Sequence, residues 1–139
     1  MKIFKYMFLF FCLFFLSGCP DPYQIQAQTA NSISLAANTS LPILIDEYKQ
    51  QGTHEITLSK NEVDATSRLL VVEKKWQPVW KAWETLRVAH NAWASIIEGK
   101  GDTIASFLAL KDAFCGLMNV WPAEIRAIPM SGIVCGVSR

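Results

Sequence analysis

The clearest hydrophobic pattern lies between residues 59 and 98. Apolar side chains recur there at alternating spacings of three and four, the period of one face of an α-helix. The stripe consists of Leu69, Val72, Trp76, Val79, Trp83, Leu86, His90, Trp93 and Ile97, with His90 as its one polar member. Ser59 and Glu62 have the spacing of a capping box at its start. We therefore predict a long amphipathic helix at about 60–98, kinked or broken near Pro78 because proline removes a helical hydrogen bond.

A second stripe with the same spacing follows a glycine-rich connection. Gly99-Lys100-Gly101-Asp102 offers a glycine to end one helix and an aspartate to cap the next. The second stripe consists of Phe107, Leu110, Phe114, Leu117 and Trp121. A short connection between two such stripes predicts that a helix at about 102–121 packs antiparallel to the first. The tail after this helix has no helical period, and we expect it to lie across the hairpin as an irregular, extended segment.

The segment before the long helix has a weaker pattern. Ser40 is suited to an N-cap, Pro42 is tolerated in a first turn and Gly52 is suited to the position after a helix end. We predict a short helix between Ser40 and Gly52. Residues 19–39 are expected to form a tether, partly helical at most. The predicted fold class is all-α, a small helical hairpin or bundle, with residues 40–139 as one helical domain.

The N-terminal segment 1–18 forms a separate unit. Lys2 and Lys5 precede an uninterrupted apolar run from Tyr6 to Leu16, which is the layout of an export signal. A helix that spans a bilayer needs about 20 apolar residues, and this run ends sooner. We therefore predict that residues 1–18 are a cleaved signal peptide.

The end of this run, Leu16-Ser17-Gly18-Cys19, resembles the lipobox of bacterial lipoproteins. The resemblance extends only as far as Cys19, and no family is identified for the rest of the chain. It implies that a diacylglycerol is attached to Cys19 and that the signal is cut before it. Two or more acyl chains anchor a protein stably where one chain does so only marginally. The alternative is an ordinary secretory signal with Cys19 beside the cut by chance.

The same resemblance bears on location. It implies a protein anchored to the cell membrane or the outer membrane, with its domain facing the periplasm or the cell exterior. In that family an aspartate after the cysteine often retains the protein at the inner membrane of Gram-negative cells. Pro20 stands there in this chain, so the outer membrane is the default where a cell has one.

Composition and charge change this picture little. Hydrophobic residues make up 51% of the chain. The excess over an ordinary globular domain lies in the signal. The formal net charge is +1, and no basic cluster suits a nucleic acid. The expected partners are therefore the membrane, through the N-terminal lipid, and an unknown envelope protein or ligand.

The four cysteines have separate expected fates. Cys12 leaves with the signal and Cys19 carries the lipid, so Cys115 and Cys135 remain in a compartment that oxidises thiols. A disulfide between them would close a loop of about 20 residues, worth roughly 3 kcal/mol in the chain-entropy model. The alternative is two free cysteines, with Cys115 buried as a small hydrophobe.

Few residues suit chemistry. His54-Glu55 begins like a zinc-protease motif, but Leu58 stands where the second histidine is needed. His90 could act as a base only if an oriented partner lay beside it, and a core or boundary histidine is the simpler interpretation. No nucleophile elbow, phosphate-binding loop or dinucleotide fingerprint is present. We expect no catalytic residue, no metal site and no cofactor.

The tryptophans are the remaining candidates for a binding site. Trp76, Trp80 and Trp83 have helical spacing and could line an aromatic groove for a sugar, lipid, peptide or partner protein. The alternative, which we favour, is that their rings fill a small core. Trp80 lies off the main stripe and is expected to be the most exposed of the three.

These observations favour a lipid-anchored cell-envelope protein whose helical domain acts as a binding or structural module without catalysis. One alternative is a phage- or prophage-encoded lipoprotein that acts in host lysis or superinfection exclusion. A second alternative is an enzyme or small-ligand binder that uses a pocket formed by tryptophan and His90.

Overall fold

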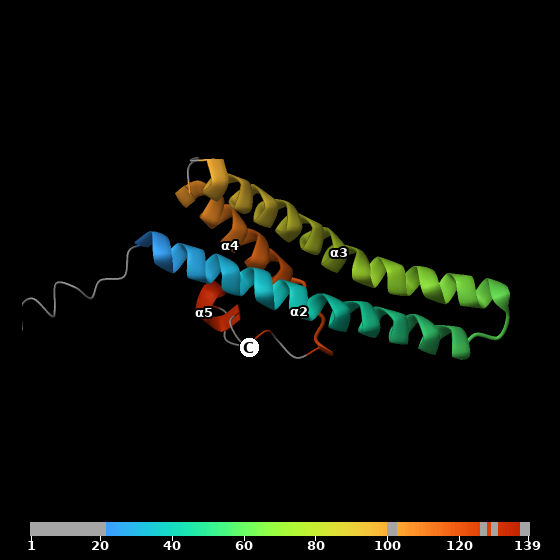
Figure 1. The fold of residues 1–139 in the computed structure, drawn as a ribbon. Helices are drawn as coiled ribbons and strands as arrows, with labels where there is room; N and C mark the ends of the chain where they lie inside the picture. Colours follow the sequence, from blue (N-terminus) through green and yellow to red (C-terminus); the bar gives the residue numbers. More distant parts are fainter. Residues whose placement is uncertain (1–21, 100–102, 126–127, 129–130, 137–139) are drawn as a thin grey trace, which may run out of the picture.

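The computed structural model describes residues 22–99, 103–125, 128 and 131–136. Four helices run through this part of the chain: α2 (Pro22–Thr57), α3 (Glu62–Gly99), α4 (Thr103–Asn119) and α5 (Ser131–Cys135) (Figure 1). The described residues contain no strand, so the predicted all-α class is confirmed. Within them, no helix has a stretch both long and apolar enough to cross a membrane.

The N-terminal helix is much longer than the sequence predicts. The short helix expected between Ser40 and Gly52 is part of α2, which also takes up residues 22–39 of the expected tether. Ser40 lies in mid-helix, buried, and its hydroxyl donates to the carbonyl of Ala37 at 2.9 Å instead of capping a helix end. Gly52 faces α3, where a Cβ would meet Leu69 at 3.6 Å. Packing against α3 and α4 stabilises the helical conformation at Ser40 and Gly52, so α2 continues through both.

The long helix α3 begins later than expected and is not broken. Asn61, not Ser59, caps it, since the Asn61 side chain accepts from the N–H of Asp64 at 2.9 Å. The Asp64 carboxylate in turn accepts from the N–H of Lys60 at 3.0 Å, so the box is shifted by two residues from the predicted one. The helix continues through Pro78. Pro78 is exposed, whereas Trp76 and Val79 on the inner side of the helix are buried.

The hairpin of α3 and α4 forms as predicted, with α2 as a third long element. α4 packs chiefly against α3 and also contacts α2. The six largest fully buried side chains come from all three helices: Trp76, Phe114, Ile33, Leu44, Leu110 and Leu117. The core is therefore shared among three helices instead of two.

The α2–α3 turn extends beyond the end of α4 as a two-helix arm (Figure 1). Ion pairs link the two helices of this arm. Arg68 contacts Glu55 of α2 at 3.0 Å and Asp64 of its own helix at 3.2 Å. The backbone N–H of Lys60, and then Arg68, hold the pKa of the Asp64 carboxyl below its usual value. These side chains are partly solvent-exposed, so they align the two helices more than they stabilise them.

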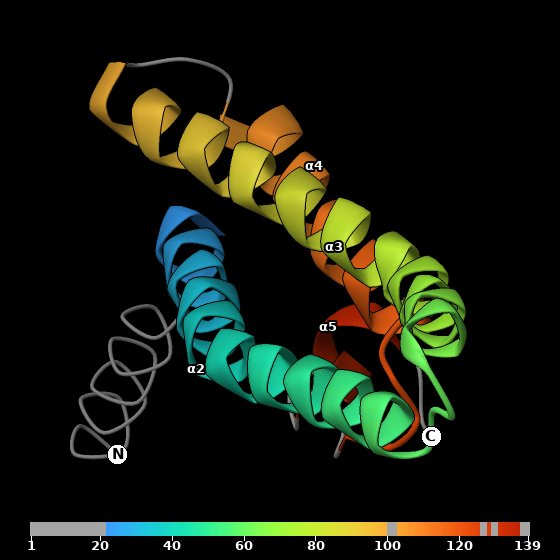
Figure 2. The ribbon, with the colours of Figure 1, turned by 90° about the vertical axis from the view of Figure 1, so that its right-hand side faces the viewer.

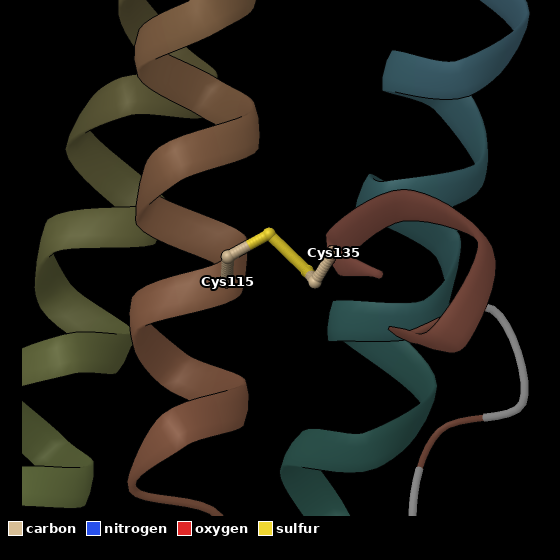
Figure 3. The surroundings of a disulfide bond; sticks show 2 residues. All are labelled: Cys115 and Cys135. Atoms are coloured by element: carbon tan, nitrogen blue, oxygen red, sulfur yellow. A yellow bond between two sulfur atoms is a disulfide. The ribbon is translucent and has the colours of Figure 1, made fainter. Parts of the chain in front are cut away.

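The C-terminal tail is tied to the bundle by a disulfide. Cys115 of α4 and Cys135 of α5 are bonded, with their Cα atoms 5.5 Å apart (Figure 3). Instead of an extended segment, residues 131–135 form the short helix α5, which lies between α4 and α2 (Figures 2 and 3). Gly136 follows it with a φ of 68°. This left-handed conformation favours glycine after a helix end.

Reduction of this disulfide should destabilise the protein without unfolding it. The bond joins residues separated by 20 positions, for which the chain-entropy model gives about 3 kcal/mol. We expect Cys135→Ser to lower the free energy of unfolding by about that amount, measured by denaturant titration, with the helical circular dichroism retained. An equal stability of the variant and the parent, or two alkylatable thiols at these positions before reduction, would contradict the pairing.

Candidate functional site

The residues proposed to carry the anchor lie outside the described part of the chain. These are the signal, residues 1–18, and the lipid-attachment candidate Cys19. The described structure begins at Pro22, three positions after Cys19 in the sequence, and Pro22 is the first residue of α2. An anchor at Cys19 would therefore act directly on the end of α2.

Two of the three candidate tryptophans form an aromatic cluster with a tyrosine of α2. Trp76 and Trp80 stack, with their ring centroids 5.5 Å apart. Tyr48 meets both rings edge-on, at 5.6 Å from Trp76 and 5.7 Å from Trp80. Such geometries are the preferred ones for aromatic pairs. Trp76 is buried, whereas Tyr48 and Trp80 are half-buried.

A hydrogen bond fixes the buried ring. The indole N–H of Trp76 donates to the side-chain oxygen of Gln51 at 3.0 Å. Lys75 donates to the same oxygen at 3.2 Å and also pairs with Glu124, beyond α4, at 2.7 Å. The ammonium of Lys75 holds the pKa of the Glu124 carboxyl below its usual value. Trp76 is thus a core residue with a satisfied polar atom, not a ligand-facing one.

Trp83 belongs to a different place. It is half-buried, as Trp80 is, and lines a groove of about 170 Å³ with His90, Arg87 and Asn38, over a floor of core side chains. Arg87 is engaged with Glu84 at 2.6 Å, and this contact lowers the pKa of the Glu84 carboxyl. The structure therefore separates Trp83 from the cluster of Trp76 and Trp80, and it places Trp83 beside His90.

The aromatic cluster opens onto a surface that α4 does not cover. We call this surface the aromatic face, and its members are Ile45, Tyr48, Ile56, Leu69 and Trp80. Residues three or four positions apart, or at multiples of these spacings, lie on one side of a helix. Ile45, Tyr48 and Ile56 therefore share one side of α2. On α3, Ala82 lines a groove together with residues of α4. Trp80 comes two positions earlier, about 160° away around the helix, so it lies on the side of α3 away from α4. Each member of the aromatic face is half-buried or exposed.

A charged groove of about 740 Å³ lies on the other side of the arm. Its lining includes Glu47, His54, Arg68, Lys75 and Glu124. Acidic and basic groups alternate there and several of them are paired with one another. In the described part of the chain no group of three or more histidine, cysteine or acidic side chains could hold a metal ion.

Sequence reasoning missed the α2 half of the aromatic site. Tyr48 and Gln51, which hold the cluster from α2, continue the spacing of the buried residues Ile33, Ala37 and Leu44. That period is visible in the sequence, but small and polar residues interrupt it. The buried side of α2 could therefore be recognised from the spacing of these residues, but not from their hydrophobicity.

Comparison with known proteins does not identify a relative. No protein-family model, curated protein or solved structure matches this chain. The function is therefore inferred from the residues and their geometry.

Proposed function

We propose that this chain is a lipid-anchored module of the bacterial cell envelope that binds another envelope component and performs no catalysis. The observation that carries the proposal is Leu16-Ser17-Gly18-Cys19, placed after a basic start and an apolar run. A thioether-linked diacylglycerol on Cys19 would hold the mature chain at a membrane surface.

The shape of the domain suits a module that reaches away from the membrane. α2 has 36 residues. At about 1.5 Å per residue its length is about 54 Å. It starts three positions from the anchor and ends at the tip of the two-helix arm (Figure 1). The arm would therefore lie at the far end of α2 from the lipid.

The aromatic face is the surface that we propose for the partner. Half-buried tyrosine and tryptophan supply large contact areas with little loss of side-chain entropy, and such residues dominate the energetics of many interfaces. Ile56 and Leu69 add exposed apolar area beside them. An apolar or amphipathic segment of an envelope protein has the matching chemistry.

A packing role accounts for the pocket at His90 better than a catalytic or ligand-binding one. Ligand pockets usually measure about 300–1,000 Å³. This groove is smaller, at about 170 Å³. Its floor consists of core side chains such as Ile33, Leu86 and Leu110. His90 therefore serves the packing of α2 on α3.

Site-specific photocrosslinking in cells tests the binding surface. A photoreactive amino acid in place of Leu69, on the aromatic face, is expected to give a discrete adduct. The matched control is Val71, exposed two positions away on the other side of the same helix. The adduct should disappear when Trp80→Ser removes the neighbouring ring. Adducts at Val71 alone, or no adduct at either position, would contradict this surface.

A further inference from the structure

Charge is distributed unevenly along the bundle. No aspartate, glutamate, lysine or arginine occurs in residues 22–44 of α2, 88–97 of α3 or 103–110 of α4. We call these three segments together the neutral half. The described charged side chains of these helices lie between Asp46 and Arg87 and at Lys111 and Asp112, whereas Lys60 and Glu124 lie outside the helices.

The three neutral segments lie together in space. α2 begins, α3 ends and α4 begins at the same end of the molecule, opposite the tip of the arm (Figures 1 and 2). The rings of Trp93 and Phe107, 5.7 Å apart, join the α3 and α4 segments. Charges return in the sequence after Ile97, with Glu98, Lys100 and Asp102. The neutral half therefore lies at the end of α2 that follows Cys19, and the charged residues of the α3–α4 connection adjoin it in the sequence.

Large apolar side chains are exposed on this region. Ile104 and Leu108, one turn apart on α4, are 60% and 50% exposed. Ile25 and Leu35 of α2 are also exposed. An exposed apolar surface without charges costs little to transfer into the boundary between lipid headgroups and acyl chains, whereas a charged side chain is costly to bury there.

We propose that the neutral half docks against the surface of the bilayer that holds the Cys19 lipid. The three positions between Cys19 and Pro22 span at most about 11 Å when extended, so this end cannot leave the membrane surface. The exposed apolar side chains stand among polar ones, a mixture that suits the interfacial layer of a bilayer. The inference rests on the proposed function, because it takes lipid at Cys19 as its starting point.

The composition of the neutral half also determines which lipids matter. Attraction to anionic headgroups requires lysine or arginine near the surface. The three segments contain neither, and Lys100, which lies between two of them in the sequence, is accompanied by the acidic residues Glu98 and Asp102. Docking should therefore be the same on neutral and on anionic membranes, driven by apolar contact and by the tether.

Hydroxyl-radical footprinting on vesicles tests the docking. The chain from Cys19 to Arg139 is coupled through the Cys19 thiol to a maleimide phospholipid in phosphatidylcholine vesicles, and is compared with the same chain free in solution. Oxidation of Ile104 and Leu108, read by mass spectrometry, should fall at least threefold on anchoring. The matched controls, Val63 and Leu70 on the arm, are 77% and 52% exposed and should not change.

The outcomes separate this inference from the lipidation on which it rests. Unchanged oxidation of Ile104 and Leu108, or an equal fall at Val63 and Leu70, would overturn the docking. So would protection that appears only when phosphatidylglycerol is added. The double variant Ile104→Asp, Leu108→Asp should restore oxidation of Ile25, with its circular dichroism unchanged. Because the chemical anchor replaces the cellular one, an unmodified Cys19 in cells would overturn the proposed function alone.

Discussion

Replacing Cys19 with alanine is expected to abolish acylation and to release the protein from the membrane fraction. The thiol is the only group to which the thioether-linked lipid can attach, so the loss should be complete. The anchor also supplies the stable part of membrane affinity, since a helical bundle without acyl chains binds bilayers weakly and reversibly. Growth with an alkyne-labelled palmitate analogue, followed by gel fluorescence and fractionation, measures both effects.

Cys12 provides the matched control for this experiment. It lies in the apolar run of the same signal, so Cys12→Ala changes a cysteine without touching Leu16 to Cys19. The variant should be labelled and fractionated like the parent. If Cys19→Ala stayed with the membranes after its signal was cut, the anchor would have another origin and the lipoprotein interpretation would be wrong.

Trp76→Ala is expected to cause the largest loss of stability of any single substitution proposed for the folded domain. Trp76 is one of the largest fully buried side chains, and it touches Tyr48, Trp80 and Gln51. Tryptophan-to-alanine changes in a core cost about 3–5 kcal/mol through lost burial and the cavity left behind. A domain of this size has about 5–15 kcal/mol in total, so the variant should be marginally stable. Denaturant titration monitored by circular dichroism gives the difference.

Two further substitutions at the cluster show what Trp76 contributes. Trp80→Ala removes a half-buried ring from the same cluster and should cost less than half as much. Trp76→Phe keeps most of the apolar volume and removes only the indole hydrogen bond to Gln51, whose oxygen keeps Lys75 as a donor, so it should cost about 0.5–1.5 kcal/mol beyond the lost area. Equal effects of Trp76→Ala and Trp80→Ala would contradict the difference in burial between the two rings.

The α3–α4 hairpin could be predicted because its apolar residues are large and regularly spaced. Trp76, Leu86, Phe114 and Leu117 mark a buried side that no other secondary structure would place together. The disulfide of the tail was predicted from the proposed signal, which would remove Cys12 and use Cys19 for lipid, so that one pairing is left. Both predictions rest on strong local signals.

The length of α2 could not be predicted, because its buried side is rich in small residues. Ala30, Ala37 and Ser40 allow a close approach of helices but carry little hydrophobic signal. Pro42 and Gly52, which usually mark helix ends, lie inside the helix because tertiary packing outweighs their local preferences. Pro42 lies on the exposed side, where the missing hydrogen bond is least costly.

The aromatic site was only half visible for a related reason. Trp76 and Trp80 could be grouped by their spacing, whereas the partner Tyr48 lay in a segment assigned to another short helix. Trp83 was grouped with them, but its side chain lines the groove with His90. Spacing along one helix shows which side chains share a side, but the neighbouring helix decides which of them touch.

Intact-mass spectrometry of the protein purified from the membrane fraction is the most direct test of the lipid anchor. We predict the mass of a chain that begins at Cys19, increased by a diacylglyceryl group, with or without a further acyl chain. Alkaline hydrolysis should then remove the ester-linked acyl chains and leave the glyceryl thioether. An unmodified mass, either of the full 139 residues or of a chain cut elsewhere, would contradict the account.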